Sequence, residues 1–185
     1  MRYGKRMLIV TLLLTILLVN MAAPASAYSY SGYKWKANYV VPKIDSSVPS
    51  SWTTAIKAGA TAWNNADATF TFKWITSAAD NGIYCTSAGS EYLGLAVPTR
   101  SGGYNTGYKM YFNTDYTWST ASGGESGKFD VQSVATHELG HWLTLWDLYD
   151  STDSEKTMYK WTASNEIKKR TLHSDDIAGI KHIYP

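Results

Sequence analysis

The chain has 185 residues, with 17 lysines and arginines against 15 aspartates and glutamates. Such a balance leaves no basic patch, which argues against nucleic acid or an anionic membrane surface as a partner. The single cysteine, Cys85, excludes an internal disulfide, and we expect it to be a small buried apolar side chain.

Residues 1–27 have the order of a secretory signal peptide. Three basic residues lie within the first six positions, an apolar run covers 7–19, and the Ala-Ser-Ala at 25–27 is a small-residue cleavage site. A membrane anchor is the weaker interpretation, because the apolar run is shorter than the roughly 20 residues that a spanning helix needs. We therefore expect a secreted, extracellular protein with no membrane segment after signal removal.

The mature part, 28–185, has the size of one compact domain with a single core. Removing the three basic residues of the signal leaves 14 lysines and arginines against 15 acidic residues, a net charge of −1. Eight tryptophans and fourteen tyrosines are expected to serve mainly as core, because aromatic side chains bury large areas. No linker divides the sequence.

Hydrophobic periodicity predicts short strands and three helices. Apolar residues alternate, as in strands, over 35–41, 70–74, 92–97 and 109–113, with a shorter candidate near 83–85. They recur at helical spacing over 50–64, 131–143 and 174–184. Pro42 and Pro98 are expected to end two of the strands, and Asp130 and Ser174 to cap two of the helices.

Residues 137–141 read His-Glu-Leu-Gly-His, which is the HExxH spacing. On a helix, residues four apart lie on one face, so His137 and His141 can reach one Zn²⁺ at about 2.0–2.1 Å each. Glu138 follows the first histidine and can act as general base on a metal-activated water without binding the metal. The segment therefore predicts a catalytic zinc site.

Catalytic zinc sites usually have three protein ligands and one open position. Asp147 follows His141 by six residues, and on a continuous helix it would point about 120° away from that histidine. It can bind only if the chain leaves the helix near Thr144 and turns back. Asp150 and Asp153 are geometric alternatives.

These residues resemble the metzincin metalloproteases. His137 to Asp147 resembles the extended motif HExxHxxGxxH, with Asp in the last place and Thr144 where the motif has glycine. Met158-Tyr159 resembles the Met-turn of the matrixins. The Asp-Asp-Ile-Ala-Gly-Ile at 175–180 resembles their last helix.

The resemblance implies an α+β fold of the zincin/metzincin catalytic type. This fold has a twisted mixed sheet with an antiparallel edge strand, an active-site helix, a Met-turn and a C-terminal helix. It implies Zn²⁺ held by His137, His141 and Asp147, with Met158 as a floor beneath the site. Tyr159 takes the place of the matrixin tyrosine, where no metal bond is expected.

The resemblance also implies a zinc endopeptidase that acts on proteins or peptides. An extended substrate would lie antiparallel to the edge strand, against Leu93, Gly94, Leu95 and Ala96. Gly94 marks either a close backbone approach or a bulge. Calcium sites of the family type cannot be placed from the sequence, and the oligomeric state is not readable.

Two alternatives stay open. In a gluzincin-type protease, the third ligand would be Glu166 of the Asn165-Glu166 pair. The tryptophan and tyrosine content also suits a secreted glycan- or cell-wall-binding module with a structural zinc. Structural zinc sites are normally closed by four protein ligands, however, which would leave Glu138 without a task.

Overall fold

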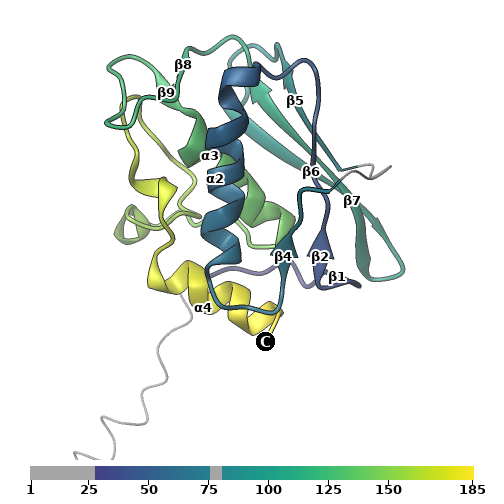
Figure 1. Cartoon of the computed structure of the whole chain (residues 1–185). Coiled ribbons are helices and arrows are strands. Elements are labelled where there is room, and N and C mark those ends of the chain that lie inside the picture. The colour runs from purple at the N-terminus through teal and green to yellow at the C-terminus, as the bar shows by residue number, and fades with distance from the viewer. Residues whose placement is uncertain (1–27, 76–80) are drawn as a thin grey trace, which may run out of the picture.

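The computed structural model describes residues 28–75 and 81–185, so the signal peptide expected over 1–27 lies outside it (Figure 1). The elements in chain order are β1 (Lys34–Trp35), β2 (Tyr39–Val40), β3 (Lys43–Ile44), η1 (Ser50–Trp52), α2 (Thr53–Asn64), β4 (Thr71–Phe72), β5 (Gly82–Thr86), β6 (Gly94–Ser101), β7 (Tyr104–Asn113), β8 (Trp118–Ser119), β9 (Phe129–Asp130), α3 (Val131–Trp142), η2 (Ser151–Asp153), η3 (Lys168–Arg170) and α4 (Ser174–Ile183). None of these helices has the length and apolar character needed to cross a membrane.

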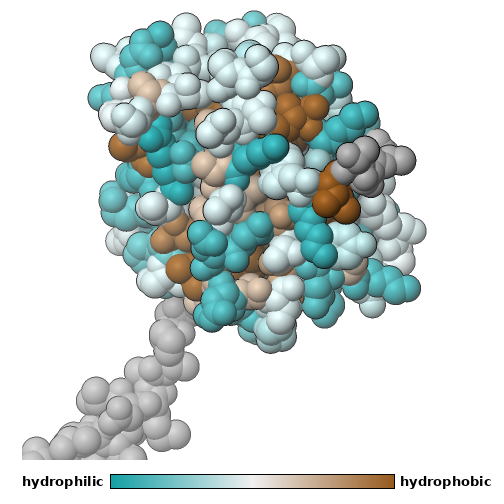
Figure 2. Space-filling view, viewed as in Figure 1, coloured by the Kyte–Doolittle hydropathy of each residue, from teal (hydrophilic) through white to brown (hydrophobic). Residues whose placement is uncertain are grey.

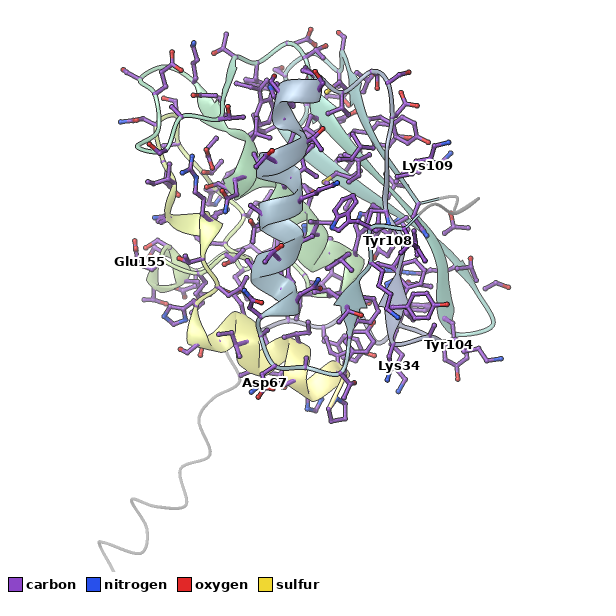
Figure 3. All side chains as sticks on the ribbon, viewed as in Figure 1. Lys34, Asp67, Tyr104, Tyr108, Lys109 and Glu155 are labelled. Atoms are coloured by element: carbon purple, nitrogen blue, oxygen red, sulfur yellow. The ribbon has the colours of Figure 1, made fainter. Side chains whose placement is uncertain are left out.

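The main sheet is mixed. Strands β3, β5 and β7 run parallel in neighbouring positions, and β1 joins the start of β7, where Lys34 lies beside Tyr104 (Figure 3). Strand β6 pairs with β7 in the antiparallel sense and has no second partner among the described strands. This arrangement confirms the expected α+β fold with an antiparallel edge strand.

Helices α2 and α3 lie together on one face of the sheet (Figure 1). Gly59 allows the close packing, because a Cβ there would lie 3.0 Å from the backbone nitrogen of Thr136. The indole nitrogen of Trp63 donates to the Thr136 carbonyl at 2.7 Å. On the opposite side of α2, Figure 2 shows hydrophobic surface only in separate patches among hydrophilic residues. The apolar stripe of α2 therefore faces α3.

Aromatic residues make up much of the core, as the composition predicts. Trp63 and Trp142 are almost completely buried, and the Trp35 indole donates to the Trp142 carbonyl at 2.7 Å. Two tryptophans depart from this pattern: Trp146 is 49% exposed and Trp161 is 59% exposed.

The prediction of one continuous strand over 35–41 is wrong. The chain bends between β1 and β2, and each strand has only two residues. The bend also changes the phase of alternation, so that Tyr39 is exposed and Val40 is buried. Buried and exposed side chains alternate within each short strand but not across the bend. The residues between the two strands include no proline or glycine that would mark the bend in the sequence.

Pro98 does not end its strand, contrary to the prediction. It lies within β6, opposite Tyr108 of β7. A proline lacks the N–H that a central strand needs, but an edge strand tolerates the loss on its free side. The strand therefore runs on to Ser101, beyond the expected end at 97.

The last helix begins as expected, but its cap is His173 and not Ser174. The His173 ring accepts from the Asp175 backbone nitrogen at 3.3 Å, and the Asp176 carboxylate accepts from the His173 nitrogen at 2.9 Å. The two contacts form a reciprocal capping box. Histidine is an uncommon cap, so the serine beside it was the natural choice from sequence.

Candidate metal centre and active-site cleft

Helix α3 begins at a strong cap. As predicted, Asp130 is the N-cap, and its carboxylate accepts from the Ser133 backbone nitrogen at 2.6 Å. Arg170 binds the same carboxylate through two nitrogens, at 3.0 and 2.5 Å. The cap fixes the start of the helix that carries His137, Glu138 and His141.

Helix α3 ends just before Thr144, where the chain must leave the helix if Asp147 is to reach the two histidines. Thr144 has a φ of +74°, in the left-handed region that favours glycine, and its nitrogen donates to the His141 carbonyl at 2.8 Å. The chain then leaves the helix axis. Thr144 thus adopts the conformation of the glycine in the family motif, at the strain cost that a β-branched residue carries there.

The turn brings Asp147 back to the two histidines. Its Oδ1 atom lies 3.2 Å from Nε2 of His137 and 3.6 Å from Nε2 of His141. One ligand atom from each of the three residues lies within 4.8 Å of the others. The structure therefore brings together the three residues that the sequence selected as ligands.

The two geometric alternatives to Asp147 have other contacts. The Asp150 carboxylate accepts from the Thr152 backbone nitrogen at 2.9 Å and caps η2. Asp153 pairs with Lys156 at 2.7 Å. Neither belongs to the group of metal-ligating side chains found among the described residues.

Hydrogen bonds on the far side of each imidazole fix its tautomer. Nδ1 of His137 lies 2.8 Å from the Thr157 carbonyl, and Nδ1 of His141 lies 2.8 Å from the Leu145 carbonyl. Since a carbonyl can only accept, both Nδ1 atoms carry the hydrogen in the neutral ring. The lone pairs of both Nε2 atoms then face Asp147. Metal-binding histidines normally have this outer support.

In the described chain, the carboxylate of Asp147 lacks a hydrogen-bond donor at the point where it meets the two imidazoles. Oδ1 of Asp147 is buried and has no hydrogen-bond partner among the described residues. With both Nε2 atoms unprotonated, these contacts bring lone pairs of nitrogen and oxygen together, and a cation bound between them relieves the repulsion. Burial and the neighbouring His137 lower the pKa of His141 to about 4, which keeps it neutral, as a ligand must be. Two imidazole nitrogens and a carboxylate oxygen fit Zn²⁺.

Glu138 lies beside the group but does not join it. Its Oε2 atom is buried without a hydrogen-bond partner in the described chain, and burial raises its pKa to about 7. A Cβ at position 94 would lie 2.7 Å from Oε1 of Glu138, and the pairing of β6 with β7 is regular there. Gly94 therefore serves close backbone approach, and the bulge interpretation is wrong.

A cleft of about 700 Å³ runs along β6 and the metal-ligand group. Its lining includes His137, Glu138, His141 and Asp147 together with the edge-strand residues Leu93, Gly94, Leu95 and Ala96. Leu93 precedes the start of β6, and the other three belong to it. The structure thus places the residues selected for substrate binding beside Glu138.

The predicted Met-turn lies beneath α3. Met158 is 2% exposed and its sulfur packs where a side chain on Gly140 would otherwise lie. Tyr159 follows in a bridge to Leu148, and its side chain does not line the cleft. The turn supports the ligand helix from below, since Thr157 holds His137.

Sequence reasoning missed the role of Asp176. Asp176 lies in the first turn of the last helix, where an acidic residue ordinarily complements the positive helix end. Its buried carboxylate instead accepts from the backbone nitrogens of Thr157, at 2.9 Å, and of Met158, at 3.2 Å. It anchors the Met-turn to α4. The match of 175–180 to a family motif was the available signal.

Lys169 was also missed. It is 2% exposed, lines the cleft, and donates from Nζ to the Tyr159 carbonyl. Burial lowers its pKa to about 8. A Lys-Lys-Arg run normally indicates a solvated surface, so nothing in the sequence singled out its middle residue.

The remaining candidates lie outside the metal-ligand group. Glu166 accepts a weak hydrogen bond from the Ala163 nitrogen at 3.4 Å and lies 3.6 Å from Lys168. Cys85 on β5 is only half-buried, and not fully buried as predicted, but this burial still raises the pKa of its thiol to about 11.

Comparison with known proteins agrees with this geometry. The family model described as matrixin matches residues 30–185. The chain belongs to the matrixin family. Matrix metalloproteinase-16 from rat, human and mouse is 33% identical over 82 residues, which is 44% of this chain and 13% of the relative. Matrixins are zinc-dependent endopeptidases, so the family accounts for a His-His-Asp group beside a peptide-sized cleft.

Proposed function

We propose that this matrixin is a secreted zinc endopeptidase in which His137, His141 and Asp147 hold the metal. The observation that carries the proposal is the buried Oδ1 atom of Asp147, which faces two imidazole lone pairs and has no other partner in the described chain. The alternative with a structural zinc expects four protein ligands, whereas this group has three.

Zinc, when bound, polarises the scissile carbonyl and makes an attacking water more acidic. Glu138 takes the proton of that water and delivers it to the leaving amine. A carboxyl group with a pKa of about 7 suits both steps, because it exists in both protonation states near neutral pH.

The substrate binds as an additional strand on β6. Main-chain groups at the free edge of β6 pair with the peptide, and Gly94 lets its backbone pass close to Glu138. In an antiparallel arrangement, the N-terminal half of the peptide lies towards Pro98 and Arg100. The C-terminal half lies beyond Leu93.

Replacing Glu138 with alanine tests the chemistry. The variant should bind one zinc, like the wild type. Wild type should cleave a denatured protein in a reaction that a chelator stops, and the variant should not cleave it. Persistent cleavage by zinc-loaded Glu138→Ala would contradict the proposal.

The choice of third ligand is tested separately. Zinc content is measured on Asp147→Ala and on Glu166→Ala after dialysis against the same buffer. We expect zinc to be lost only from the first variant. Loss only from the second would favour the gluzincin-type site.

The export proposal has its own measurement. The intact mass of the protein recovered from the medium should correspond to a chain that starts near Tyr28. A mass that retains residues 1–27 would contradict it.

A further inference from the structure

Lys169 is a buried cation on the wall of the cleft. Its residue is 2% exposed, and its only hydrogen bond in the described chain goes to the Tyr159 carbonyl. Burial lowers its pKa to about 8, while the carboxylates of Glu166, Glu138 and Asp147 favour the charged form. The side chain therefore carries positive charge in a place where water has little access.

No carboxylate of the described chain forms a direct ion pair with this charge, although Glu166, Glu138 and Asp147 act on it from farther away. An ammonium has three donors, and a buried charge is normally paired with an opposite one. Lys168, its neighbour, has Glu155 at 3.1 Å and Glu166 at 3.6 Å, but Lys169 forms no such pair. Two of its donors are left for something that enters the cleft.

The contacts of Arg170 show at which end of α3 this lysine lies. Arg170 grips Asp130, the N-cap of α3, so η3 runs beside the first turns of that helix. Phe129 and Val134 lie at the same end and also line the cleft. A Cβ at position 94 would lie 2.7 Å from Val134, so the start of β6 lies over this end as well.

A peptide antiparallel to β6 has its C-terminal half at the start of that strand. The residue that follows the scissile bond therefore lies on the side of Glu138 where Val134, Phe129 and Lys169 line the cleft. Apolar walls at this place suit the stem of a substrate side chain, and the Lys169 ammonium is the cation nearest to them along η3 and the start of α3.

We propose that Lys169 makes the enzyme selective for an acidic side chain, of the glutamate type, immediately after the scissile bond. The inference rests on the proposed function. The substrate carboxylate supplies the direct ion pair that the described chain does not, and it accepts hydrogen bonds from the free donors of Nζ. An uncharged side chain in the same place would leave the buried ammonium without a direct ion pair. Binding such a side chain therefore costs more free energy than binding a glutamate.

The test uses three peptides that differ only in having Glu, Gln or Leu after the scissile bond, which mass spectrometry of the products locates. They compete in one reaction with the zinc-loaded enzyme. We expect kcat/KM for the Glu peptide to exceed that for the Gln peptide at least about 10-fold, the range of a hydrogen bond between charged groups.

Substitution of Lys169 separates specificity from support of the Tyr159 carbonyl. In Lys169→Met the ratio of Glu to Gln cleavage should fall to about 1, and Lys169→Arg should keep the preference for Glu. If Lys169→Met slows all three peptides equally, the residue is structural and the inference is overturned. Thermal unfolding of each variant checks that it is folded.

Lys168→Met is the matched control. It removes the same charge one residue earlier, from a side chain that pairs with Glu155 and does not line the cleft. Lys168→Met should keep the preference for the Glu peptide. Loss of that preference would show that selectivity depends on the net positive charge of this region and not on Lys169 itself. If wild type cleaves the Gln and Leu peptides as fast as the Glu peptide, the inference fails and the endopeptidase proposal stands. If zinc-loaded wild type cleaves no peptide or protein, the endopeptidase proposal itself fails.

Discussion

The two sides of the metal-ligand group differ in how their polar atoms are satisfied. Below the group, Nδ1 of each histidine bonds to a carbonyl, and the Asp176 carboxylate accepts from the backbone of the Met-turn. On the cleft side, Asp147 Oδ1 and Glu138 Oε2 are buried without hydrogen bonds among the described residues.

The difference separates support from chemistry. Buried polar groups are nearly always paired, so the completed contacts mark the part of the site that the protein itself fixes. The uncompleted ones lie where a metal and a substrate would contribute the missing partners. The satisfied side fixes the geometry, and the open side binds and reacts.

Zinc should produce the largest effect, because it completes the open side. At about 1,000 times its dissociation constant, a ligand specific for the folded state stabilises by about 4 kcal/mol. We expect zinc to raise the free energy of unfolding of wild type by that order, measured by thermal unfolding with zinc and with a chelator. The stabilisation should vanish at the same zinc concentration in Asp147→Ala.

Asp150→Ala is the control for that prediction, because Asp150 caps η2 and belongs to no metal-ligand group among the residues that the structure describes. Its zinc stabilisation should match wild type. Equal stabilisation of Asp147→Ala and wild type would show that the unsatisfied oxygen is not a ligand.

On the supporting side, we expect the largest loss of stability from replacing Asp176. Asp176→Ala leaves the buried N–H groups of Thr157 and Met158 without an acceptor, at about 1–3 kcal/mol for each group. We expect a loss of about 3 kcal/mol in the free energy of unfolding, measured with denaturant. Zinc affinity should fall roughly 10-fold or more, because the Thr157 carbonyl orients His137.

Asp175→Ala provides the comparison for Asp176→Ala. Asp175 is partly exposed and shares Lys156 with Asp153, so its loss should cost less than about 1 kcal/mol. Its zinc affinity should not change. If both variants lose zinc equally, the support is a property of the whole helix start and not of the Asp176 carboxylate.

The smallest effect is expected at Thr144, between the two sides. A non-glycine residue in the left-handed region costs about 1–2 kcal/mol, but glycine would give up the buried methyl and hydroxyl groups of the threonine and gain freedom when unfolded. We expect Thr144→Gly to change the free energy of unfolding by no more than about 1 kcal/mol, with full zinc content. A loss of zinc would mean that threonine itself shapes the turn.

Local patterns predicted those elements whose determinants are close in sequence. The HExxH spacing predicts the two histidines, and Asp130 predicts the start of α3. Asp147 could be selected as a ligand from its spacing, but its position in space depends on the left-handed turn at Thr144, which the spacing does not specify.

Contacts between distant segments lie beyond the reach of local patterns. Asp176 reaches the Met-turn 18 residues away along the chain, and nothing local marks its carboxylate as buried. Lys169 looks like one of three solvated basic residues until η3 packs against α3. Pro98 ends a strand by local rule, but its place at a sheet edge removes the penalty.

The most direct test of the zinc site is anomalous diffraction at the zinc absorption edge from crystals of the zinc-loaded protein. We predict one strong peak bonded to Nε2 of His137, Nε2 of His141 and a carboxylate oxygen of Asp147. The two histidine bonds should be about 2.0–2.1 Å long, and one position should be open towards Glu138. A peak bonded to Glu166 in place of Asp147, or no peak at the two histidines, would contradict the proposed site.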